Sequence, residues 1–141
     1  MGRRITVRPA TQADLPWLTE HDGHLGAERI AAKVAGREVL VAEVDGVPAG
    51  MLRLDHLWSA VPYMALVRVL APFRRQGVGR ALVGAVCEHA REMGADFVLS
   101  SATGDEPEPQ AWHRAVGFEP CGELSGINPG GVGEVFFRLP V

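Results

Sequence analysis

A change of hydrophobic period in the middle of the chain constrains the fold more than any other feature. Residues 63–70 form an apolar run typical of a buried strand, whereas from Gly77 to Met93 apolar residues recur at helical spacing. Gly94 is a typical residue for ending that helix, and residues 97–100 form a second short apolar run. A strand, a helix and a second strand in this order predict a parallel pair of strands joined by a right-handed crossover.

The remaining elements follow from shorter patterns. Residues 39–57 give a clear hairpin signal, because two apolar runs flank Asp45-Gly46, a dipeptide suited to a tight turn with positive φ. We expect strands at 5–8, 39–44, 49–57, 118–121 and 134–139, and helices from Thr11 to about 20, over 23–36 and over 110–116. The order β-α-α-β-β-β-α-β-α-β-β predicts an α/β (α+β) fold, a mixed sheet flanked by helices, in one domain spanning residues 1–141.

Charge and cysteine content exclude several classes of function. The chain has 14 basic and 17 acidic residues, a net charge of −3, whereas nucleic-acid binding needs a clearly basic domain. Arg68 interrupts the longest apolar run, so none reaches the roughly 18 residues of a membrane helix. Two cysteines, Cys87 and Cys121, are too few for a disulfide framework, and we expect free, buried thiols in a cytoplasmic protein. We expect neither nucleic acid nor membrane as a partner.

The segment 67–80 is the one that most resembles a ligand-binding site. A buried strand leads into a turn with Gly77 and Gly79, and a helix begins there. The N–H groups of a helix N-terminus favour a phosphate or pyrophosphate, and neighbouring arginines would add charge. The segment fits neither the Walker A pattern nor the dinucleotide-binding pattern, which would need a small residue at Leu82. The alternative is a helix start made permissive by glycine, under a solvated arginine patch.

Four stretches resemble the GNAT N-acetyltransferase superfamily. Arg74-x-x-Gly77-x-Gly79 is similar to the Gln/Arg-x-x-Gly-x-Gly/Ala signature with which that family holds the pyrophosphate of acetyl-CoA. Residues 6–14 look like the family's opening, residues 41–46 like its hairpin, and residues 112–118 like its aromatic-Tyr-x-x-x-Gly-Phe block. The resemblance covers nearly the whole chain. It implies the GNAT-like acyl-CoA N-acyltransferase fold, acetyl-CoA as the acyl donor and no metal.

The resemblance also implies roles for particular residues. The backbone of the strand would contact the pantetheine arm and thioester at Val67, Arg68 and Val69, with an N–H near Val67 as oxyanion donor. The turn and helix start would hold the pyrophosphate through Arg74, Arg75, Gln76, Gly77, Val78, Gly79 and Arg80. A neutral primary amine would then attack the thioester directly in a ternary complex and expel the CoA thiolate.

The chain departs from the family pattern at three positions. His113 stands where the family has the Tyr that protonates the thiolate; it is our candidate catalytic residue, and the alternative is a structural histidine beside Trp112. Ser101 stands where some members have a carboxylate base, and Glu106 where an Asn often contacts the cofactor. A base would have to come from elsewhere, and the candidates are Glu20, Asp22, Asp55, His56, Asp105, Glu106 or a water chain.

The acceptor is the least constrained part of the prediction. The segment 21–24 contains two histidines and an aspartate, too few ligands for a zinc site, and we expect it to form a rim near the acceptor. Trp17, Trp58 and Tyr63 are either core residues or pocket residues. The acidic segment 105–108 weakly favours a cationic amine, on a small molecule or a protein. Monomer and homodimer both stay open, and the competing functions are a non-catalytic acyl-CoA sensor and a binder of another phosphorylated ligand.

Overall fold

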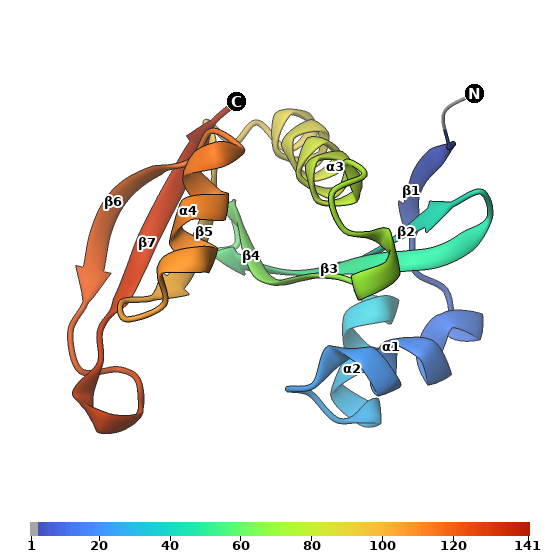
Figure 1. Cartoon of the computed structure of the whole chain (residues 1–141), viewed down its shortest axis with the longest axis horizontal. Helices are drawn as coiled ribbons and strands as arrows, with labels where there is room; N and C mark the ends of the chain where they lie inside the picture. Colours follow the sequence, from blue (N-terminus) through green and yellow to red (C-terminus); the bar gives the residue numbers. More distant parts are fainter. Residues whose placement is uncertain (1–2) are drawn as a thin grey trace. The chain divides into compact units, whose positions relative to one another are not determined.

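The computed structural model describes residues 3–141, and its strands and helices follow the predicted order (Figure 1). The helices are α1 (Leu15–Asp22), α2 (Ala27–Ala35), α3 (Val78–Glu92) and α4 (Pro107–Ala115). The strands are β1 (Ile5–Pro9), β2 (Val39–Val44), β3 (Val47–Leu57), β4 (Val61–Val69), β5 (Phe97–Thr103), β6 (Glu119–Leu124) and β7 (Glu134–Pro140). In the described part of the chain these seven strands form one mixed sheet in the order β1-β2-β3-β4-β5-β7-β6. The predicted fold class is confirmed.

The described residues form two compact units, and the division falls within β3, β4 and α3. The first unit runs to Asp55 and adds Ala65–Ala85, whereas the second comprises His56–Met64 and Val86–Val141. That the whole chain behaves as one domain stays a prediction.

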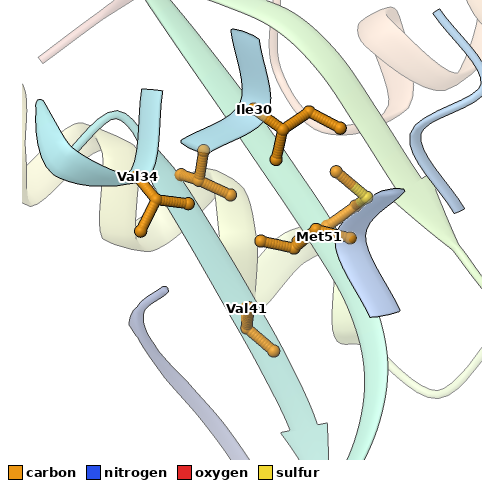
Figure 2. Packing of buried hydrophobic residues seen from close by; sticks show 6 residues of the cluster. Ile30, Val34, Val41 and Met51 are labelled. Atoms are coloured by element: carbon orange, nitrogen blue, oxygen red, sulfur yellow. The ribbon is translucent and has the colours of Figure 1, made fainter. Parts of the chain in front are cut away.

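The first unit is built on the antiparallel strands β1, β2 and β3. Asp45 and Gly46 have φ values of 51° and 81°, which is the tight turn predicted between β2 and β3. In Figure 1, α1 and α2 lie on one face of these strands and the first half of α3 lies on the other. Figure 2 shows how Ile30 and Val34 of α2 pack against Val41 of β2 and Met51 of β3. The helical spacing of the apolar residues in α2 therefore gives this unit its core.

Gly50 allows a close approach between β3, β4 and the start of α3. A Cβ atom built on Gly50 would lie 2.9 Å from the carbonyl oxygen of Arg68 and 3.1 Å from Cγ1 of Val78. Both distances are below ordinary van der Waals contact, so a side chain at this position would displace backbone or a buried residue. The absence of a side chain at Gly50 thus allows β3, β4 and the start of α3 to lie close together at the segment predicted to bind a ligand.

The second unit contains the parallel pair that the sequence predicted. Tyr63 and Met64 of β4 pair in parallel with Leu99 and Ser100 of β5, while β7 pairs antiparallel with both β5 and β6. Helix α4 packs on β5. It begins at Pro107, three residues earlier than predicted, because proline needs no N–H acceptor in the first helical turn.

Two details of the second unit correct the sequence predictions. Strand β6 extends to Leu124, three residues beyond the predicted end at residue 121. Every residue of β6, which is one of the two edge strands of the sheet, is exposed. Cys121 is therefore an exposed thiol rather than a buried one, whereas Cys87 is buried as expected, and burial raises the pKa of its thiol. Across residues 3–141, every helix is too short or too polar to span a bilayer.

Candidate functional site

The turn between β4 and α3 has a backbone shape suited to wrapping a ligand. After β4, the Leu70 N–H donates to the carbonyl of Ala49 at 2.8 Å, and Ala71–Phe73 form a single 3-10 turn. Arg75 and Gly77 then have φ values of 62° and 92°. A β-carbon disfavours such values, and glycine adopts them freely. The first glycine of the motif is thus explained by local geometry.

The start of α3 places the first backbone N–H groups of a helix beside exposed arginines. The first intrahelical bond runs from the Ala81 N–H to the carbonyl of Gly77, at 3.0 Å, so the amides before Ala81 precede the helical ladder. Arg74, Arg75 and Arg80 are exposed, and so is Gly77. The Arg74 Nε also donates to the Val69 carbonyl at 3.1 Å, which fixes that arginine beside the turn. This arrangement of helix N-terminus and guanidinium groups fits a phosphate or pyrophosphate.

Gln76 and Val78 have structural tasks within the predicted set. The Gln76 side chain donates to the Pro72 carbonyl at 3.1 Å and accepts from Arg3 at 3.3 Å, which closes the turn. Val78 is buried, with 1% exposure, against Gly50. Gly79 is half-buried on the first helical turn. Residues 74–77 thus form the turn and residues 78–80 begin α3, with Gln76 and Val78 serving the shape of this segment; that the segment binds a ligand stays a prediction.

The β4 residues 67–69 are half-buried. The Arg68 side chain reaches the turn after α1, where its Nη2 lies 3.5 Å from the position a Cβ of Gly23 would take. Among the described residues, the Nε of Arg68 is a buried donor without an acceptor. Arg68 therefore links β4 to the segment 21–24, which was predicted to form a rim near the acceptor.

Asp22 is a structural residue rather than a base. It is fully buried, and its carboxylate accepts from Arg53 Nε at 3.0 Å and from the amides of His24 and Leu25 at 3.0 and 2.8 Å. Burial by itself would raise the pKa of Asp22, but these hydrogen bonds outweigh it and hold the pKa below its usual value. This carboxylate fastens the end of α1 to β3.

His113 is held on all sides in the second unit. Its exposed fraction is 5%, its Nδ1 lies 2.7 Å from the Pro109 carbonyl, and its Nε2 lies 2.7 Å from the Ser100 hydroxyl. Since a carbonyl can only accept, Nδ1 carries the proton, and the neutral ring accepts from Ser100 at Nε2. The ring stacks on Phe137 at 4.8 Å. Burial lowers the pKa of His113, against the opposing effects of the Pro109 carbonyl and Glu134. These contacts match the structural alternative, and a catalytic role stays a prediction.

On the second unit's sheet, a row of hydrogen-bonded side chains joins three strands. The Tyr63 hydroxyl lies 2.6 Å from the Ser101 hydroxyl, which donates to Glu134 Oε2 at 2.6 Å, and Asn128 donates to Glu134 Oε1 at 3.0 Å. The Tyr63 ring stacks on Phe136 with centroids 5.9 Å apart. Sequence reasoning missed Glu134 and Asn128, because no local pattern marks them: strand register brings Glu134 to Ser101, and Asn128 reaches Glu134 from the loop before β7.

The other base candidates have different surroundings. Asp55 pairs with Lys33, and His56 lies with its Nε2 3.0 Å from the Nε2 of His89. Glu20, Asp105 and Glu106 are exposed. Within residues 3–141, His, Cys, Asp and Glu side chains form no group of three or more that could hold a metal ion.

Residues 3–141 form a mixed seven-stranded sheet with four helices, which is the fold of solved acetyltransferase structures of the GNAT family. Residues 7–118 match the model of the acetyltransferase (GNAT) family, and the chain belongs to that family. Family membership supports an acetyltransferase activity in general.

Individual relatives agree with this assignment. Aminoglycoside N(6')-acetyltransferase type 1 of Stenotrophomonas maltophilia is 28% identical over an alignment of 153 residues. The alignment covers 96% of this chain and 94% of the relative. The ribosomal-protein-alanine N-acetyltransferase of Brucella melitensis has a similar structure, with a TM-score of 0.79, 25% identity and coverage of 96% and 99% of the two chains. The yncA protein of Salmonella typhimurium, solved with its cofactor acetyl-CoA, has a TM-score of 0.80 at 19% identity, covering 96% and 93%.

Proposed function

We propose that the protein transfers an acetyl group from acetyl-CoA to a primary amine of a small molecule or a protein. The observation that carries this proposal is the turn at residues 74–80, where Arg75 and Gly77 have positive φ, α3 begins and three arginines are exposed. This combination fits the pyrophosphate of CoA in both shape and charge. A cytoplasmic location, suggested by the unpaired cysteines, belongs to the same proposal.

The residues of the chain would divide the work as follows. Residues 74–80 would bind the pyrophosphate, and the backbone of Val67, Arg68 and Val69 would bind the pantetheine arm. Acetyl-CoA supplies a thioester whose carbonyl carbon accepts the amine. A backbone N–H near Val67 would stabilise the oxygen as it becomes negative, a type of interaction worth about 3 kcal/mol. The C–N bond forms, the C–S bond breaks, and the proton lost by nitrogen ends on the thiolate.

His113 is the proposed proton donor to that thiolate. Because the pKa of His113 is lowered, the ring is neutral at neutral pH. Its single N–H, at Nδ1, donates a hydrogen bond to the Pro109 carbonyl. To act as an acid, His113 would therefore have to be protonated transiently at Nε2, where it otherwise accepts from Ser100, and give that proton to the thiolate. Because this proton donor is demanding to form, the alternative stays open that the chain binds acyl-CoA as a sensor and transfers no acyl group.

An amine acceptor is supported by the names of two relatives, one an aminoglycoside acetyltransferase and the other a ribosomal-protein-alanine acetyltransferase. Asp105, Glu106 and Glu108 are exposed at the start of α4 and would attract a cationic amine. Polyamines, aminoglycosides and peptides with a free N-terminus are therefore the first candidate acceptors to test. Whether the protein acts as a monomer or a homodimer is left to measurement.

Calorimetric titration with acetyl-CoA tests the donor site. The wild-type chain should bind acetyl-CoA at micromolar concentration and more tightly than ADP. Gly77→Ala should weaken binding about five- to thirtyfold, because alanine disfavours a φ of 92°, at a cost of about 1–2 kcal/mol. Gly84→Ala is the matched control, since Gly84 lies exposed on α3 with open space around it. Equal affinities of the folded wild type and Gly77→Ala would contradict the assignment.

A panel of amines then separates an enzyme from a sensor. Free CoA should be measured by chromatography, because the exposed Cys121 would react with thiol reagents. Release of CoA together with an acetylated amine supports transfer. Binding of acetyl-CoA with no release across the panel supports the sensor.

A further inference from the structure

The row formed by Tyr63, Ser101 and Glu134 has a defined direction of hydrogen-bond donation. The Ser101 hydroxyl donates to Glu134 Oε2, so its single proton points to that carboxylate. Since Ser101 has no second proton, the Tyr63 hydroxyl is the donor in its contact with Ser101. Both O···O distances are 2.6 Å, at the short end of the range for O–H···O hydrogen bonds. Donation therefore runs from β4 through β5 to β7.

The surroundings hold this row in place. The Tyr63 ring stacks on Phe136, and Asn128 holds the second oxygen of Glu134. In the register of the sheet, Ser101 pairs with Phe136 and Thr103 pairs with Glu134, so these side chains share one face. All three members of the row are half-buried, which limits competition by water.

We propose that this row is the proton-accepting path of the acetyl transfer, with Tyr63 receiving the proton of the acceptor ammonium and Glu134 as its final holder. The inference rests on the proposed function and supplies the base that Ser101 itself cannot be. Tyr63 is the member that would touch the substrate. Ser101 and Glu134 act through it, as positioning and proton-relaying residues.

The step balances without a further reactant. The ammonium nitrogen gives one proton to the Tyr63 oxygen as Tyr63 gives its own proton to Ser101, and Ser101 gives its proton to Glu134. The amine becomes neutral and Glu134 becomes a carboxylic acid. The amine then attacks the thioester, the thiolate leaves with the second proton of nitrogen, and Glu134 returns its proton to solvent.

Other ionisable groups lie near Glu134. The Glu123 carboxylate of β6 lies over Gly133, and His113 of α4 interacts electrostatically with Glu134. On β5 the neighbours are the uncharged Ser101 and Thr103. The test must therefore distinguish Glu134 from a nearby carboxylate.

The experiment compares Glu134→Gln, Ser101→Ala and Ser101→Thr with wild type, using an amine that wild type acetylates. At pH 7, Glu134→Gln and Ser101→Ala should lower kcat/KM about a hundredfold, the lower end of general-base effects. The deficit should shrink about tenfold per pH unit as more of the amine is already neutral, whereas the affinity for acetyl-CoA stays unchanged. Ser101→Thr keeps the hydroxyl and should restore activity. Glu119→Gln, on the exposed strand β6, is the matched control.

A second measurement needs no acceptor. Tyr63 is the single tyrosine of the chain, so labelling tyrosine with 13C at Cζ gives one resonance that reports the hydrogen bond of its hydroxyl. Ser101→Ala and Glu134→Gln should both shift this resonance, and Glu119→Gln should not.

The outcomes separate the two proposals. A wild type that acetylates amines, with variants of equal rate and equal pH profile, overturns the relay and leaves the transferase. A uniform loss at every pH, not rescued by Ser101→Thr, also overturns the relay and assigns Ser101 a structural role. A wild type that acetylates no amine overturns both, even if the resonance shows that the row exists.

Discussion

Replacing Asp22 by asparagine should destabilise the protein strongly. Asp22 is fully buried and Arg53 is 7% exposed, so neither charge can be solvated once the other is gone. Asparagine can still accept from the amides of His24 and Leu25 through one oxygen, but it offers Arg53 no charge. Breaking a buried pair by removing one partner costs 3–5 kcal/mol, and because the amide contacts survive we expect about 3 kcal/mol. This is a large part of a total stability of about 5–15 kcal/mol.

Urea unfolding measures this change through tryptophan fluorescence, since Trp17 packs against the core cluster of the same unit. The midpoint of Asp22→Asn should fall without a change of slope. Asp105→Asn makes the same chemical change at an exposed position, and it should alter stability by no more than about 0.5 kcal/mol. Arg53→Met added to Asp22→Asn should recover much of the loss, because an apolar pair needs no solvation.

The contribution of Asp22 to the free energy of unfolding should also depend on pH in a defined direction. The pKa of Asp22 is lowered in the folded state, so its contribution is complete above the unfolded value near 3.8 and is lost as pH falls through the lower folded value. The difference between wild type and Asp22→Asn should therefore be constant at neutral pH and shrink below about pH 4. A difference under 1 kcal/mol at neutral pH, or one that grows in acid, would refute the reasoning.

Three further predictions follow from packing and burial. Gly50→Ala should cost about 1–3 kcal/mol in urea unfolding, because its Cβ would meet the Arg68 carbonyl; an unchanged midpoint would show that β4 yields. His113→Phe should cost about 2 kcal/mol by leaving Ser100 and Pro109 unpaired. Because burial lowers the pKa of His113, wild-type stability should also decline as pH falls below 6.5, a decline that is smaller in His113→Phe. Gly84→Ala should raise stability by about 0.5–1 kcal/mol in a thermal melt, and a lower Tm would contradict the open space there.

Features encoded over a few residues could be predicted from the sequence. The turn at Asp45-Gly46, the change of period before α3 and the glycine at position 77 each follow from local φ preference or apolar spacing. The start of α4 was misplaced because Pro107 and Pro109 favour a loop by composition, although the first turn of a helix tolerates both. Local rules are thus reliable for the existence of an element and weaker for its ends.

In the candidate site, too, the contiguous residues could be predicted and the distant ones could not. Residues 74–80 are contiguous, so their arrangement could be predicted, and the structure shows them in one turn. Ser101 and Glu134 are 33 positions apart and meet only because β5 and β7 pair in a particular register. A shift of that register by one residue would move Glu134 to the opposite face, and no pattern within either strand specifies the pairing.

The two adjacent serines of β5 offer the sharpest comparison between the rival proton paths. Because successive side chains on a strand point to opposite faces, Ser100 meets His113 whereas Ser101 meets Glu134 and Tyr63. Ser100→Ala and Ser101→Ala remove the same hydroxyl one residue apart, so each disturbs one path and leaves the other. If His113 is the acid and Ser100 holds its ring in place, the first variant should lower kcat, with a loss that is largest in acid and fades as pH rises through neutrality, because the pKa of His113 is lowered. If the row ending at Glu134 removes the ammonium proton, the second variant should be the slower one, with a loss that fades as pH rises. Equal rates in both variants and in wild type would exclude both paths and direct attention to an exposed carboxylate such as Glu106.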